Sequence, residues 1–133
     1  MSEILLRKAP DHKNLNESQI AEVKSIFDLL TYGPFRKFAT EIIADELGPL
    51  TVRERWYKAS SLGISDETRR NISWQGSPIY VACNVIDQVH SFYPTQIEMA
   101  DLVVRIGDTT GKKINEPDVE TIVKTALKNI YND

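Results

Sequence analysis

The chain has 133 residues, of which 41% are hydrophobic and 26% are charged, and this mixture is typical of one globular domain. Its net charge of −3 lacks the strong basic excess of dedicated nucleic-acid binders. The single cysteine, Cys83, excludes a disulfide within the chain and a zinc site built from several cysteines. With neither a secretory signal nor an apolar stretch of roughly 20 residues, we expect a cytoplasmic protein that has no membrane partner.

The first half of the chain predicts a lead-in followed by helices. Residues 1–14 are the lead-in, and residues 15–133 are expected to form a single helical domain. Asn16 suits the N-cap of the first helix, since Gln19 follows three residues later and completes a capping box. Two further helices are expected over residues 35–46 and 51–62.

The second half begins with a polar stretch, residues 63–78, that we interpret as a long loop with a short extended piece near its end. The next helix is expected over residues 78–90, with Ile79 and Cys83 on its buried face. Two more helices are expected, over residues 95–106 and from Asn115 onward, separated by a turn at residues 107–113. The prediction is an all-α fold of about six short helices in a compact bundle.

Two stretches resemble the EF-hand family of calmodulin and the myosin light chains. LNESQIAEVKSIFDLL, residues 15–30, is similar to the family's opening helix in its cap and its apolar spacing. Residues 94–127 are similar to a helix-loop-helix unit in which Ile114 takes the central hydrophobic position of the loop, and a looser third match begins at Ile72. The resemblance implies degenerate helix-loop-helix units that bring Ile72 and Ile114 together on adjacent extended segments.

The loop of the second stretch lacks the ligands of a calcium site. Its first ligand position is Gly107, which offers no carboxylate, and its sixth position is Lys112 where the family requires glycine. Lys113 adds a second positive charge where the cation would bind. We therefore expect a calcium-independent protein that holds no metal and no cofactor.

No constellation of residues predicts catalysis. The two histidines, His12 and His90, are far apart in the sequence, and Cys83 lies in an apolar stripe typical of a small core residue. The motifs G-x-x-x-x-G-K-[ST], G-x-G-x-x-G and H-E-x-x-H do not occur. We therefore expect that the protein is not an enzyme and has no catalytic residues.

Two functions remain open. The first is a non-enzymatic adaptor whose apolar groove receives an amphipathic helix of another protein. Its candidate partner-binding residues are the aromatic residues and the methionine that such contacts favour: Phe27, Trp56, Trp74 and Met99.

The alternative is a small nucleic-acid-binding regulator with a helix-turn-helix-like C-terminal half. Basic side chains that alternate with aromatic ones can contact phosphates and stack on bases. The candidates for this role are Arg53, Arg55, Lys58, Arg69 and Arg70. The turn between the last two helices is about eight residues long, whereas a helix-turn-helix has three or four. Nucleic acid is therefore the less favoured partner.

Overall fold

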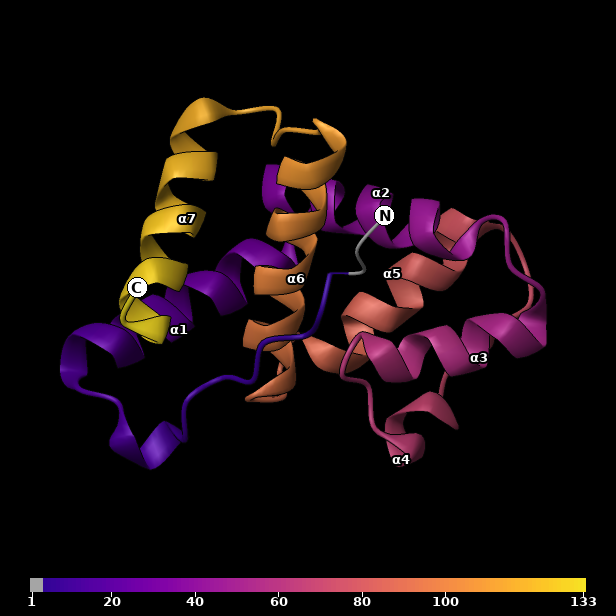
Figure 1. Ribbon diagram of the computed structural model, residues 1–133, viewed down its shortest axis with the longest axis horizontal. Helices are drawn as coiled ribbons and strands as arrows, with labels where there is room; N and C mark the ends of the chain where they lie inside the picture. The colour runs from indigo at the N-terminus through magenta and orange to yellow at the C-terminus, as the bar shows by residue number, and fades with distance from the viewer. Residues whose placement is uncertain (1–3) are drawn as a thin grey trace.

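The computed structural model describes residues 4–133, which form seven α-helices and one turn of 3-10 helix and contain no strand (Figure 1). The all-α prediction is confirmed. The elements in chain order are η1 (His12–Asn14), α1 (Glu17–Thr31), α2 (Pro34–Leu47), α3 (Val52–Ser61), α4 (Asp66–Arg69), α5 (Pro78–Val89), α6 (Thr95–Thr110) and α7 (Pro117–Tyr131).

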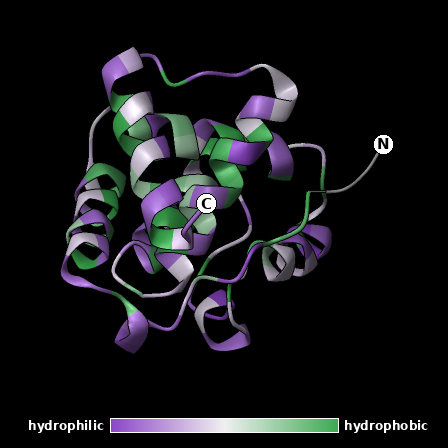
Figure 2. Ribbon diagram, turned by 60° about the vertical axis from the view of Figure 1, so that its left-hand side comes forward, coloured by the Kyte–Doolittle hydropathy of each residue, from purple (hydrophilic) through white to green (hydrophobic). Residues whose placement is uncertain are grey.

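Helix α6 lies at the centre of the molecule, with α1 and α7 on one side and α2, α5, α3 and α4 on the other (Figure 1). Helix α1 packs along α7, α2 packs along α5, and α6 contacts α1, α2 and α7. The hydrophobic faces of these helices turn toward one another (Figure 2). They form one core, whose largest fully buried side chains include Phe35, Ile26, Leu30, Ile86, Ile97 and Ile130.

Helices α1, α3 and α5 begin where local sequence signals predict, whereas α7 begins at Pro117 and is not capped by Asn115. Asn16 and Gln19 form a capping box at α1, because the Asn16 side chain accepts from the Gln19 backbone N–H and the Gln19 side chain accepts from the Asn16 backbone N–H. Thr51 and Glu54 form the same arrangement at α3. Helix α5 begins with Pro78 at its first turn, as expected.

Two of the expected element boundaries were wrong. Residues 63–78 include the single-turn helix α4, which Ser65 caps through its side chain. Helix α6 continues through Gly107 to Thr110 and ends at Gly111, whose φ of +78° is a left-handed conformation suited to glycine. Gly107 is buried against Phe38, and a Cβ placed there would lie 2.5 Å from Cζ of that ring. Tertiary packing therefore places this glycine inside a helix, where its own propensity is unfavourable.

The fold does not show EF-hand-like units. The most extensive helix packing joins α1 to α7 and α2 to α5, so helices of the two resembling stretches pair with distant partners. Ile72 and Ile114 are both buried, but residues 4–133 contain no extended pairing that would bring their segments together. None of the helices described is long and apolar enough to cross a membrane.

Candidate functional site

The residues predicted to bind a partner do not come together in one groove. Phe27 is exposed on α1, where its ring lies 5.3 Å from the His90 ring. Trp56 is partly buried and meets Trp74 edge to face at 6.5 Å. Trp74 is only 7% exposed and Met99 only 1%, so both belong to the core. In this arrangement Trp74 and Met99 offer little surface to a partner.

Two of the five basic residues proposed for nucleic-acid binding hold the fold together. Arg55 is buried and donates hydrogen bonds to the carbonyl oxygens of Leu47 at 3.1 Å and of Trp74 and Gly76 at 3.0 Å. Arg69 donates to the Trp56 carbonyl at 3.2 Å and lies over its indole ring, 4.7 Å from the centroid. One face of the Trp56 ring is therefore covered by the Arg69 guanidinium and is closed to stacking by a nucleic-acid base.

The other three basic residues do not form a continuous free stripe. Lys58 lies 3.8 Å from Glu46, and Arg70 forms an ion pair with Asp66 at 2.9 Å. Arg53 is exposed on α3. Neighbouring carboxylates thus offset part of the positive charge that a phosphate backbone would need.

A groove lies between the start of α2 and α5, with a volume of about 470 Å³. It is lined by Thr31, Tyr32, Gly33, Arg36, Lys37, Thr40, Glu41, Ile79 and Cys83. Tyr32 is 72% exposed and Ile79 is 50% exposed, so at least half of each of these two large side chains beside the groove faces solvent. A thiol on the groove wall, Cys83, is partly accessible.

Sequence reasoning missed this groove because it placed Ile79 on the buried face of α5. The buried residues of that helix are Val81, Ala82, Val85, Ile86 and Val89. At 100° per residue, Ile79 points roughly 90° away from the centre of that face. The expectation that Ile79 and Cys83 lie on the buried face was wrong, because the apolar residues of α5 cover a wider face of the helix than the one that packs against the core.

The rim of the groove carries charge of both signs. Arg36 pairs with Asp87 at 2.8 Å and donates to the Leu30 carbonyl at 3.3 Å. Lys37 and Glu41 are both exposed on α2. The groove therefore combines apolar side chains with an edge on which the exposed Lys37 and Glu41 carry opposite charges.

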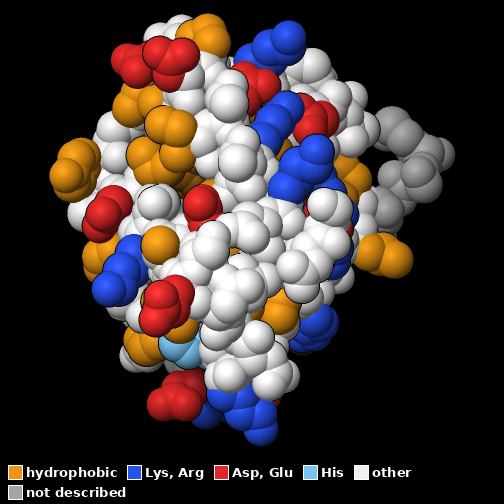
Figure 3. Space-filling view, turned by 90° about the vertical axis from the view of Figure 1, so that its left-hand side faces the viewer, with side chains coloured by type: hydrophobic (Ala, Val, Ile, Leu, Met, Phe, Trp, Pro, Cys, Tyr) orange, Lys and Arg blue, Asp and Glu red, His pale blue; other side chains and the backbone are white. Residues whose placement is uncertain are grey.

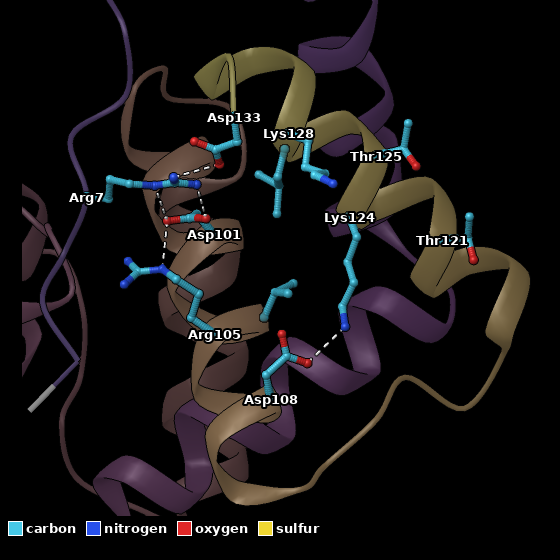
Figure 4. Close-up of a pocket in the computed structure, with 11 residues that line it drawn as sticks. Arg7, Asp101, Arg105, Asp108, Thr121, Lys124, Thr125, Lys128 and Asp133 are labelled. Atoms are coloured by element: carbon cyan, nitrogen blue, oxygen red, sulfur yellow. Dashed lines mark hydrogen bonds and ion pairs between the residues drawn. The ribbon is translucent and has the colours of Figure 1, made fainter. Parts of the chain in front are cut away.

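A second, polar pocket of about 570 Å³ lies between α6, α7 and the N-terminal segment (Figure 4). The buried carboxylate of Asp101 accepts from Arg7 at 2.8 and 3.2 Å and from Arg105 at 3.0 Å. Arg7 also pairs with Asp133 at 2.7 Å. Burial by itself lowers the pKa of Arg7, but hydrogen bonds to the two aspartates outweigh it and raise the pKa above its ordinary value.

The charge of Lys124, on the outer wall of this pocket, is also balanced by neighbouring carboxylates. Lys124 contacts Asp108 at 2.9 Å and Glu120 at 3.1 Å, and these hydrogen bonds raise the pKa of Lys124. Basic and acidic side chains likewise lie next to one another on the face that carries α1 and α7 (Figure 3). The pocket therefore presents paired charges and no concentrated field of one sign.

Residues 4–133 contain no group of three or more His, Cys, Asp or Glu side chains placed to hold a metal ion. Comparisons with protein-family models, with curated proteins and with solved structures found no match. The function is therefore inferred from the surfaces described above.

Proposed function

We propose that the protein is a non-enzymatic interaction module that binds an amphipathic helix of another protein in the groove between α2 and α5, independently of calcium. The observation that carries this proposal is the exposure of Tyr32 and Ile79 beside a groove of about 470 Å³. Tyrosine is enriched among the residues that dominate binding energy at protein interfaces, and covering an apolar side chain favours association.

The charges at the groove specify the partner further. The exposed Lys37 lies beside the apolar surface formed by Ile79 and Cys83, whereas Arg36 is already paired with Asp87. A helix that places an acidic side chain next to two or three apolar ones would complement both features. The nucleic-acid alternative has less support, because Arg55 and Arg69 are engaged in hydrogen bonds within the fold.

The test compares two isoleucines of equal exposure. Ile79 on α5 and Ile122 on α7 are each 50% exposed, but only Ile79 lines the groove. We expect Ile79→Glu to abolish capture of a partner from the native source, whereas Ile122→Glu retains it. An identical set of captured proteins for wild type and both variants would refute the groove as the binding site.

Cys83 provides a direct measurement at the groove. It is the single cysteine of the chain, so a thiol reagent reports on this position alone. We expect an amphipathic peptide of about 18 leucine and glutamate residues, close to five helical turns, to slow modification of Cys83 in wild type and Ile122→Glu. The same peptide should leave the rate unchanged in Ile79→Glu. An unchanged rate in wild type at saturating peptide would contradict the proposal.

A further inference from the structure

The N-terminal segment, residues 5–10, runs without helical structure across the face of α6 (Figure 1). Side chains from α6, from α7 and from the residues just before α6 hydrogen-bond to its backbone. Arg105 donates to the Leu5 carbonyl at 2.8 Å, Tyr131 donates to the Arg7 carbonyl at 3.0 Å, Glu98 accepts from the Ala9 N–H at 2.9 Å, and Tyr93 donates to the Pro10 carbonyl. The segment is thus held in the way that a protein holds an extended peptide.

Two side chains of the segment fit positions of their own. The Arg7 guanidinium donates twice to Asp101 and pairs with Asp133 (Figure 4). It also lies over the Tyr131 ring, 3.8 Å from the centroid. Leu6 lies against Gly63, where a Cβ would be 2.9 Å from its Cδ2. Gly63 therefore leaves room for Leu6 by having no side chain.

The two buried acidic residues of α6, Glu98 and Asp101, each have a partner in this segment. Glu98 is 4% exposed and Asp101 is 3% exposed, and a buried carboxylate is costly unless it is paired or hydrogen-bonded. The Ala9 N–H donates to the Glu98 carboxylate, and the Arg7 and Arg105 guanidiniums donate to the Asp101 carboxylate. Burial raises the pKa of the Tyr131 phenol, which keeps it protonated as a donor to the segment.

The contacts to the segment are of two kinds, as in peptide-recognition grooves: some involve its backbone and others involve its side chains. Hydrogen bonds to the backbone supply affinity, and sites for particular side chains supply specificity. Here the backbone contacts involve Leu5, Arg7, Ala9 and Pro10, and the side-chain sites take Leu6 and Arg7. The pattern selects leucine followed by arginine in an extended chain.

We infer that the surface formed by Gly63, Glu98, Asp101, Arg105 and Tyr131 is a recognition site for an extended peptide with a Leu-Arg pair. Residues 5–10 occupy it within the same chain, and a segment of the same pattern from another polypeptide binds there in exchange. This site shares no lining residue with the groove between α2 and α5.

Exchange requires the tethered segment to leave. A short tether gives it an effective concentration of the order of millimolar, so a free peptide competes poorly with the wild-type segment. Replacing Arg7 by glutamate puts two carboxylates against the new side chain and weakens the tethered segment specifically. Lys8 is the matched control, because it is the next residue, carries the same charge and is exposed.

The experiment measures binding of the fluorescein-labelled peptide ILLRKAPD, residues 4–11, to full-length protein by fluorescence anisotropy. We expect Arg7→Glu to bind it at least about tenfold more tightly than wild type, and Lys8→Glu to bind it as wild type does. The peptide with its own arginine replaced by glutamate should not bind Arg7→Glu. Absence of binding to a folded Arg7→Glu, or equal binding of both peptides, would overturn the inference.

A second measurement uses wild type and so does not depend on how the variant folds. In uniformly ¹⁵N-labelled protein, unlabelled ILLRKAPD at about 10 mM, above the effective concentration of the tethered segment, should accelerate solvent exchange of the Ala9 amide, because the tethered segment is displaced from Glu98. Exchange of buried α6 amides should not change. An Ala9 amide that exchanges at the same rate with and without peptide would mean that the segment is a permanent part of the fold.

Discussion

At the scale of single residues, the guanidinium of Arg55 joins three parts of the chain. It donates to the Leu47 carbonyl at the end of α2 and to the Trp74 and Gly76 carbonyls that precede α5. The last carbonyls of a helix have no partner within that helix, so Arg55 also satisfies the end of α2. Arg55, which the sequence pattern placed among exposed basic residues, is therefore buried and joins α2, α3 and the segment before α5 through hydrogen bonds.

We expect Arg55→Ala to lower the free energy of unfolding by about 3 kcal/mol, because three carbonyls lose a charged donor inside the protein. Arg53→Ala, on the same helix but exposed, should change it by less than about 0.5 kcal/mol. Urea denaturation measures both. Equal effects of the two substitutions would show that the Arg55 hydrogen bonds contribute little.

At the scale of helices, Gln19 performs two functions. Its side-chain oxygen completes the capping box of α1, and its Nε2 donates to the Asn129 and Ile130 carbonyls near the end of α7 at 3.0 and 3.3 Å. The cap at α3 has only the first function, since the Glu54 side chain hydrogen-bonds only with Thr51 among residues 4–133. Hydrogen bonds from the Thr51 backbone and side chain lower the pKa of Glu54.

Gln19→Ala should therefore destabilise the protein by about 2 kcal/mol, which combines a lost cap with lost hydrogen bonds to α7. Glu54→Ala should lower the free energy of unfolding by less than Gln19→Ala does. Because the pKa of Glu54 is lowered on folding, its contribution should be lost as the pH falls through its folded-state pKa, whereas that of Gln19 should persist. Thermal unfolding at neutral and acidic pH measures the difference, and a larger effect of Glu54→Ala at neutral pH would contradict this account.

The capping boxes also show how far local sequence specifies elements. Asn16 with Gln19 and Thr51 with Glu54 are residues three apart, so their hydrogen bonds form as soon as the helix begins. The end of α6 could not be predicted in this way. Gly107 lies inside the helix because Phe38, which is distant in sequence, packs against it.

At the scale of the whole molecule, the buried hydrophobic residues of every helix from α1 to α7 except the single-turn α4 belong to one core. Both tryptophans lie on one side of it, on α3 and in the segment after α4. Helices α1 and α7 lie on the other side (Figure 1). A single core predicts that the two sides unfold together.

Tryptophan fluorescence and far-ultraviolet circular dichroism should therefore give the same urea midpoint. Fluorescence reports on the neighbourhood of Trp56 and Trp74, whereas circular dichroism reports on all helices. Coincident curves would establish residues 15–133 as one cooperative domain. A lower midpoint by fluorescence would instead show that α3 and α4 unfold separately from the bundle.

The sequence by itself determined the all-α class and the starts of most helices, because periodicity, caps and prolines act between residues a few positions apart. Only the tertiary structure decided which apolar and charged residues are exposed. Met99 and Trp74 lie in the core, Ile79 lies at a groove, and Arg7 meets Asp101 across 94 positions of the chain. Surfaces that bind partners are built from such distant residues, so their composition depends on how the helices pack.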